Sequence, residues 1–300
     1  MLRCTHLLCL LLLATPAFAD PASLGELPAV AALQPPRTVA PPPSDAARAR
    51  ILWDESQRLE NMDDFLGAAE LRARVAELRP QDAHVRWRIA RDLLHGVSSI
   101  PASDREGRLQ TFETARDWAR EGTERDAHCG ECCLYEFAST AQLATAAGLP
   151  RSVGHVREAG ETLDRCLAMP PTWSEPRWGH ERGHLYYGAA AFYRMLPDGA
   201  WARWVLGLRG DPERAVEMAR RATLVSPEES AFRAELGAAL LCHASRSGDP
   251  AAGAEGRRLL TAVDSDVAAE TPARVRAAGL LAAPDESCDD SEHHERVSWN

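Results

Sequence analysis

Two short stretches of this sequence carry side chains that could bind a metal ion or transfer electrons. The first is His180-Glu181-Arg182-Gly183-His184, which has the His-Glu-x-x-His pattern of zinc proteases. On a helix, His180 and His184 lie one turn apart on the same face, and Glu181 could polarise a metal-bound water. Catalysis also needs a third ligand, and the extended pattern has glycine where this chain has Tyr187. A zinc-dependent hydrolase and a non-catalytic metal site are therefore kept as alternatives, not as the main prediction.

The second stretch is His128-Cys129-Gly130-Glu131-Cys132-Cys133. The spacing of Cys129 and Cys132 suits a redox pair or half of a zinc site. No strand is predicted before this pair, and no second pair at similar spacing completes a zinc site. We therefore expect packing cysteines with one or two disulfides. The pairing is left open by the sequence among Cys129, Cys132, Cys133, Cys166, Cys242 and Cys288.

Aromatic residues are densest between Trp173 and Trp204. Most of them should be core, and the surplus is the predicted binding surface or cavity wall. The residues predicted to contact a partner are Tyr186, Tyr187, Tyr193, Trp201 and Arg203. The arginines that could hold a carboxylate are Arg177, Arg182, Arg194 and Arg203.

The element that must organise this region runs from Asp211 to Ala244 and reads as two antiparallel helices. Asp211 can cap the first helix and Pro212 suits its first position. Ser226, Pro227 and Glu228 repeat this start signal for the second helix. The residues predicted to pack between helices are Ala215, Ala219, Ala222, Pro227, Leu236, Gly237 and Leu240.

This spacing of small residues, proline and Leu-Gly resembles the tetratricopeptide repeat (TPR). The resemblance implies an array of helix pairs that serves as an interaction scaffold. The order of elements from Cys129 to Val263 is also similar to the TPR-like proteins grouped with the T-component of TRAP-type transport systems and with microtubule-dynamics regulators. That narrower likeness implies a ligand or partner cavity near the aromatic residues, with self-association, and carries over no binding residue.

The predicted fold class is all-α: a degenerate, TPR-like array of antiparallel helix pairs, or α-solenoid, with four or five pairs. Strand-like alternation is nearly absent from the chain. Ser103 and Glu106 have the spacing of a capping box for the helix that ends near Glu124. Arg72 stands where the repeat usually has a bulkier apolar residue. The helices are expected at about 45–59, 63–78, 82–95, 103–124, 129–147, 152–168, 175–194, 201–206, 211–225, 226–243, 249–263 and 271–281.

The chain ends read differently from this array. Residues 1–19 have the charged start, apolar run and Ala17-Phe18-Ala19 site of a signal peptide, so export to a periplasm or beyond is expected. Residues 20–43 are rich in proline and alanine and read as a disordered linker. The array is expected over 44–283, and an acidic, flexible tail over 284–300, where Cys288, His293 and His294 could bind a metal loosely.

Composition narrows the function classes. The formal charge of −10 argues against a nucleic acid or an anionic membrane as the main partner. The sequence contains no lysine, which excludes a phosphate-binding loop with its usual lysine and a Schiff base. No later segment is apolar enough to span a membrane.

The sequence therefore predicts an exported, non-catalytic scaffold that binds a protein or peptide on its concave face, without a cofactor. A periplasmic transport-accessory protein that forms a homo-oligomer is the first alternative. The zinc-dependent hydrolase is the second.

Overall fold

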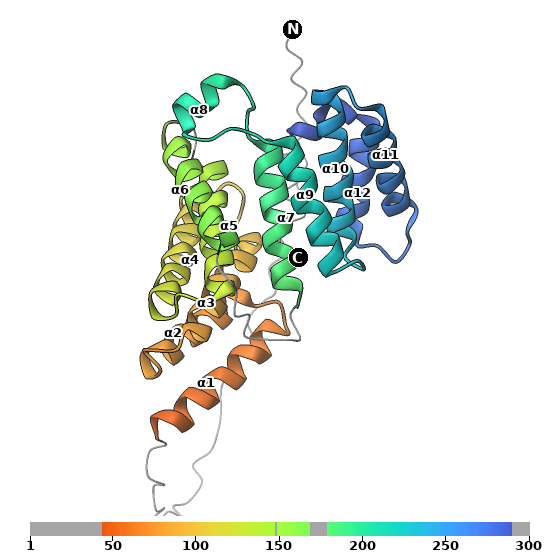
Figure 1. The fold of residues 1–300 in the computed structure, drawn as a ribbon. Coiled ribbons are helices and arrows are strands. Elements are labelled where there is room, and N and C mark those ends of the chain that lie inside the picture. Colours follow the sequence, from red (N-terminus) through yellow and green to blue (C-terminus); the bar gives the residue numbers. More distant parts are fainter. Residues whose placement is uncertain (1–43, 148, 169–178, 290–300) are drawn as a thin grey trace, which may run out of the picture. The chain divides into compact units, whose positions relative to one another are not determined.

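The computed structural model describes residues 44–147, 149–168 and 179–289, and contains only helices there (Figure 1). The all-α prediction is therefore confirmed over this part of the chain. The predicted signal peptide, the linker and most of the acidic tail lie outside the described residues. The α-helices are α1 Asp45–Glu60, α2 Phe65–Leu78, α3 Ala83–Gly96, α4 Arg105–Arg125, α5 Gly130–Ala146, α6 Leu149–Ala168, α7 Gly179–Met195, α8 Ala200–Leu206, α9 Pro212–Val225, α10 Ser230–Ser247, α11 Pro250–Ser265 and α12 Thr271–Ala282. Two short 3₁₀ helices, η1 Val97–Ser99 and η3 Pro284–Cys288, complete the described elements.

The helices pack as consecutive pairs. The pairs are α1–α2, α3–α4, α5–α6, α7–α9 and α10–α11, and α12 packs against both helices of the last pair. From the second pair onward, the first helix of each pair contacts the first helix of the next, in the order α3, α5, α7 and α10. The closing helix α12 continues this row by its contact with α10. The array predicted from the sequence is thus present within the described residues, with five pairs and a closing helix (Figure 1).

Aspartates define several helix starts. The carboxylates of Asp64, Asp82 and Asp104 each accept a backbone N–H from the first turn of the following helix. The capping box predicted at Ser103 and Glu106 is wrong, because Asp104 takes the capping position and accepts the Gly107 N–H at 2.9 Å. A carboxylate at this position also interacts favourably with the helix dipole.

The central pair starts as predicted but its second helix begins later. Asp211 caps α9 through the Arg214 N–H at 3.0 Å, and Pro212 occupies the first helical position. The start predicted for the second helix at Ser226 is wrong, since α10 begins at Ser230. Pro227 is exposed in the intervening turn, so it ends α9 and does not pack between helices.

Small residues allow the helices of the central pair to approach closely. Ala215, Ala219 and Ala222 are completely buried along one face of α9. On α10, Leu236 and Leu240 are buried beside Gly237, and a Cβ atom on Gly237 would stand 2.6 Å from the Leu260 side chain of α11. The neighbouring helices lie so close to these positions that a larger side chain would not fit.

Arg72 occupies its apolar repeat position by forming ion pairs. Its guanidinium is fully buried and contacts the carboxylates of Glu60 and Asp92. Arg91 contacts the same two carboxylates. Burial raises the pKa of Asp92 even though both guanidiniums act to lower it. The network therefore joins α1, α2 and α3 by ion pairs. An apolar side chain at position 72 could join these helices only by packing.

A second buried network joins later helices. The Arg194 guanidinium from α7 donates to Glu235 of α10 at 2.9 Å. Glu235 also accepts from Arg276 of α12 at 2.6 Å, and all three side chains are fully buried. Arg194 was predicted as one of the arginines that could hold the carboxylate of a ligand, but here it is buried and paired with a carboxylate of this chain. Arg194 further donates to the Ser287 carbonyl of η3.

Three disulfides connect the cysteines of the predicted mature chain, which is more than the one or two expected. Cys129 pairs with Cys132, Cys133 with Cys166, and Cys242 with Cys288. The last bond holds η3 against α10, and Ser287 is buried there. The flexible tail predicted from Pro284 onward is therefore wrong for residues 284–289, because a covalent bond and a hydrogen bond to Arg194 fix them.

Candidate interaction groove

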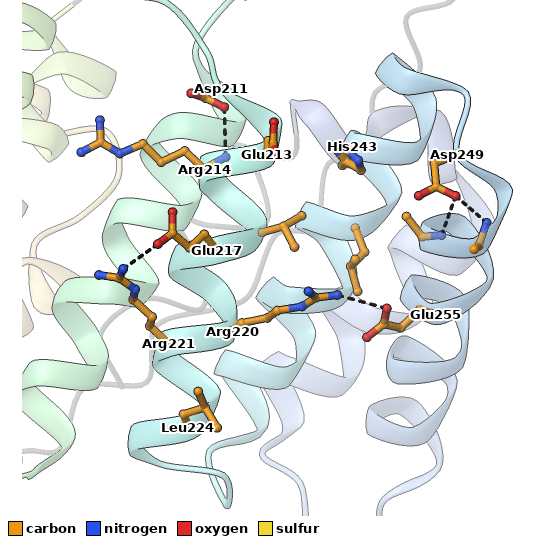
Figure 2. Close-up of a pocket in the computed structure, with 14 residues that line it drawn as sticks. Asp211, Glu213, Arg214, Glu217, Arg220, Arg221, Leu224, His243, Asp249 and Glu255 are labelled. Carbon is orange, nitrogen blue, oxygen red and sulfur yellow. Dashed lines mark hydrogen bonds and ion pairs between the residues drawn. The ribbon is translucent and has the colours of Figure 1, made fainter.

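A surface groove of about 840 Å³ lies between α9 and α11, with α10 beneath it (Figure 2). It therefore spans the second helices of two consecutive pairs. The lining residues are Asp211, Glu213, Arg214, Val216, Glu217, Arg220, Arg221, Leu224, Leu240, His243, Asp249, Ala251, Ala252 and Glu255. Sequence reasoning missed this groove, because its residues come from three helices and share no motif.

The floor of the groove is apolar. Val216 of α9, Leu240 of α10 and Ala252 of α11 are all buried, with exposed fractions below one tenth. Leu224 lies toward the end of α9 and is 82% exposed. An isolated leucine at the surface needs no explanation, but this one also lines the groove and adds exposed apolar area at its end.

The walls of the groove are charged. Arg220 of α9 reaches across to Glu255 of α11 at 3.3 Å, and Arg221 pairs with Glu217 on α9 at 2.5 Å (Figure 2). Solvent screens exposed pairs of this kind, and each contributes little to stability. Such side chains can exchange their partners for the groups of a bound molecule at small cost. The lining contains five carboxylates and three arginines.

The turn from α10 into α11 positions the residues that line one side of the groove. Asp249 caps α11 by accepting the N–H groups of Ala251 and Ala252, at 2.9 and 3.3 Å. Gly248, with φ of +73°, ends α10 in the left-handed region that favours glycine. The first turn of α11 therefore lines the groove opposite the start of α9 (Figure 2).

The His-Glu-x-x-His segment lies at the start of α7. Both carboxylate oxygens of Glu181 accept from the Tyr135 hydroxyl, at 3.0 and 3.1 Å. Burial raises the pKa of Glu181 above its usual range. The ring of His184 packs edge-on against Phe232 at 5.1 Å, and the side chain of His180 lies outside the described residues. The glutamate that a hydrolase would use as its base is thus engaged inside the helix array.

Among the residues with described side chains, no three His, Cys, Asp or Glu groups come together in a way that could hold a metal ion. Cys129 and Cys132 form a disulfide with each other, so in this state neither has a free thiol to bind a metal ion. Cys129 also occupies the capping position of α5, where its sulfur accepts the Cys132 N–H at 3.1 Å. His293 and His294 lie outside the described residues.

The five predicted partner-binding residues do not form one surface. Tyr187 is buried against Phe232, with ring centroids 5.4 Å apart. Tyr193 is buried as well, and its hydroxyl donates to Asp164 at 3.3 Å. Burial raises the pKa of Tyr193. Both tyrosines therefore belong to the core: Phe232 of α10 packs against Tyr187, while Asp164 of α6 and Arg214 of α9 contact Tyr193.

The other three predicted residues lie apart from one another. Tyr186 is half-buried on α7, where Arg182 donates to its hydroxyl at 3.1 Å and the Arg221 guanidinium lies 5.9 Å from its ring centre. Arg203 is exposed on α8, and the side chain of Trp201 lies outside the described residues. The contact with Arg221 brings Tyr186 near the groove, whereas Arg203 is on a different helix that packs against α6.

The fold has a counterpart among solved structures. A thermophilic TPR protein from Thermus thermophilus superposes with a TM-score of 0.51 at 15% sequence identity, covering 78% of this chain and 99% of that chain. This chain has a TPR-like fold. At this level of identity the TPR likeness concerns the fold alone. No protein-family model and no curated protein matches the sequence.

The TPR-like array explains the order of contacts described above. In such arrays each pair packs only on its neighbours, which leaves extended surfaces for a partner. The narrower likeness to transport T-components stays a prediction. Within the described residues, no helix is both long and apolar enough to cross a membrane.

Proposed function

We propose that this protein is an exported, non-catalytic scaffold that holds an extended peptide segment of a protein partner in the groove between α9 and α11. The observation that carries the proposal is the combination of an apolar floor, made by Val216, Leu240 and Ala252, with charged, exchangeable walls. Alternate side chains of an extended peptide could contact the floor, while its polar groups meet the arginines and carboxylates of the walls.

The groove supports this proposal better than the row of first helices does. Every residue of α5 from Gly130 to Thr140 is buried, as are the residues of α3 from Val85 to Asp92. A side chain that is already buried offers no area to a partner. The proposed site therefore lies on the second helices α9 and α11, and the binding to a concave face expected from the sequence stays a prediction.

Export is supported by two independent features. The first nineteen residues have the pattern of a signal peptide. The three disulfides of the structure would persist in an oxidising compartment and not in a reducing cytosol. Secretion into culture medium or periplasm, measured with an antibody to the chain and abolished by deletion of residues 1–19, tests this part.

Selection of random twelve-residue peptides on the purified, oxidised chain tests the groove. Leu224→Asp places a charge at the exposed end of the apolar floor, where it should not disturb folding. We expect peptides selected on the wild type to bind this variant at least about tenfold more weakly, the equivalent of about 1.4 kcal/mol. Arg220→Glu should also weaken binding and alter its salt dependence.

Val267→Asp is the matched control, because Val267 is 89% exposed in the turn after α11 and does not line the groove. Peptides that bind the wild type and both groove variants equally would show that the site lies elsewhere. If the selection yields no peptide that binds the wild type, this result would count against the scaffold function itself.

A further inference from the structure

The connection between α7 and α9 contains a segment whose chemistry differs from the rest of the chain. Between Asp198 and Asp211 the sequence has no acidic residue and has two arginines, Arg203 and Arg209. The whole chain carries a formal charge of −10. This connection is therefore a local cationic segment in an acidic protein, and it contains the short helix α8.

Helix α8 presents an aromatic side chain outward. Trp204 is 91% exposed, whereas Trp53, Trp87 and Trp118 are half-buried or buried. Val205, beside Trp204, is 43% exposed. Burying such surface is worth far more than burying the same area of a polar side chain, so an exposed tryptophan is a strong candidate for contact with something apolar.

The opposite side of the segment is packed and ordered. Ala202 is completely buried, and Leu206 is buried as well. Leu208 lies so close to α6 that a Cβ atom on Gly160 would stand 2.4 Å from its side chain. The segment is therefore folded against α6, and Trp204 is exposed by the fold and not by disorder.

Hydrogen bonds hold both ends of the segment. The Arg157 guanidinium from α6 donates to the carbonyls of Val205 and Leu206 at 3.1 and 3.4 Å, which satisfies the end of α8. At the base, the Gly210 N–H donates to the Pro197 carbonyl at 2.9 Å. A side chain displayed from a fixed backbone loses less entropy on binding than one in a mobile loop.

We propose that α8 and the residues that follow it form a docking element for an anionic lipid surface. Trp204 would enter the headgroup region, and Arg203 and Arg209 would pair with lipid phosphates. Arg203 and Trp204 stand on a short helix, Arg209 follows it, and Trp204 protrudes with 91% of its surface exposed, which suits a surface better than a peptide. Arginine prefers phosphate, and the lack of acids in the segment removes local repulsion from such a surface.

The contact is weak and reversible, because one short amphipathic element anchors an acidic protein. The net charge of −10 opposes the approach of the chain to an anionic membrane. Salt screens charges that are more than about 8 Å from the membrane at physiological ionic strength. The repulsion by distant acidic groups is therefore weakened, whereas the arginines of the docking element attract lipid phosphates at contact distance. This inference does not depend on the proposed function of the α9–α11 groove.

Sedimentation with lipid vesicles tests the proposal on the purified, oxidised chain. Vesicles of phosphatidylglycerol mixed with phosphatidylcholine should retain the wild type, and vesicles of phosphatidylcholine alone should retain much less. We expect Trp204→Ala to lower the partition coefficient about tenfold. The double variant Arg203→Gln/Arg209→Gln should lose the preference for phosphatidylglycerol, as should the wild type in about 0.5 M salt.

Val267→Ala is the matched control, since Val267 is also strongly exposed but lies in the turn after α11 and does not line the groove. Trp204→Phe keeps a ring and should retain most of the binding, which separates docking from any loss of folding. Binding equal in the wild type and Trp204→Ala, or no binding to phosphatidylglycerol, would overturn the proposal. Self-association that Trp204→Ala abolishes, without vesicle binding, would assign the surface to a second copy instead.

Discussion

The backbone carbonyl of Gly237 on α10 lies against the Cα of Gly256 on α11. A Cβ atom built on Gly256 would stand 2.9 Å from that carbonyl oxygen. We expect Gly256→Ala to lower the free energy of unfolding by about 1–3 kcal/mol, because two helix backbones would have to separate. Urea unfolding followed by circular dichroism would measure it.

Gly154 provides the control for this prediction. It lies in α6, and apart from its chain neighbours and the backbone of its own helix no atom lies within 4 Å of the position that its Cβ would take. Gly154→Ala should therefore raise the free energy of unfolding by about 0.5–1 kcal/mol through helix propensity alone. Equal effects at Gly154 and Gly256 would mean that the close α10–α11 approach does not exist.

Asp63 and Asp64 are adjacent acids with opposite expected effects. Asp63 has φ of +61°, in the left-handed region, while Asp64 caps α2 by accepting the Gly67 N–H at 3.0 Å. Asp63→Gly should raise the melting temperature, by relief of up to about 1 kcal/mol of backbone strain. Asp64→Ala should lower it, by loss of about 1 kcal/mol from the cap. A destabilised Asp63→Gly variant would contradict this conformation.

Glu235 lies between two buried arginines, so its removal should be costly. Glu235→Ala deprives Arg194 and Arg276 of a shared carboxylate, and we expect a loss of about 3–5 kcal/mol. Replacing all three residues by apolar ones of similar size should recover much of that loss. Thermal unfolding of both variants would measure these changes in stability. A loss well below about 3 kcal/mol for Glu235→Ala would contradict the full burial of the three charged side chains.

Glu181 and Glu60 should give opposite pH dependences. Burial raises the pKa of Glu181, so the native state binds its proton more tightly than the unfolded state does. The stability cost of ionising Glu181 therefore sets in as pH rises above the unfolded pKa. The free energy of unfolding of Glu181→Gln, relative to that of the wild type, should therefore increase from about pH 4.5 toward neutrality. Urea unfolding at each pH would measure it.

For Glu60, partial burial acts to raise the pKa, but Arg91, Arg72 and Arg88 together bring it below its usual range. Its stabilising contribution is present above the unfolded pKa and is lost as pH falls through the folded pKa. Glu60→Gln should therefore be most destabilised near neutrality and approach the wild type in acid. The same sign of pH dependence for both variants would contradict one of the two assignments.

The three disulfides should differ in their contribution. Cys242–Cys288 spans 46 residues and Cys129–Cys132 only 3, so loop entropy predicts stabilisation of about 4 and about 2 kcal/mol. Double alanine variants of each pair, compared by urea unfolding, would test this order. Peptide mapping of the oxidised protein by mass spectrometry checks the pairing itself, and a Cys166–Cys242 linkage would contradict it.

Local chemistry in the sequence determined the helices and their repeat. Asp211, Pro212 and the alanines of α9 act within a few residues of one another, so their capping, backbone restriction and small-residue spacing can be read without a structure. The same holds for the small face of α10 around Gly237. Errors arose where two nearby residues competed for one role, as with Ser103 and Asp104, or where proline ended one helix without starting the next.

Only the tertiary structure decided which side chains meet. Arg72 looks like a break in the repeat until Glu60 and Asp92 are placed around it, and Tyr187 looks available until Phe232 covers it. The groove needs Arg220 and Glu255, which are 35 residues apart and meet at 3.3 Å. Helix periodicity determines the face on which a residue lies, whereas burial and charge pairing depend on the neighbouring helices, and those contacts are long-range.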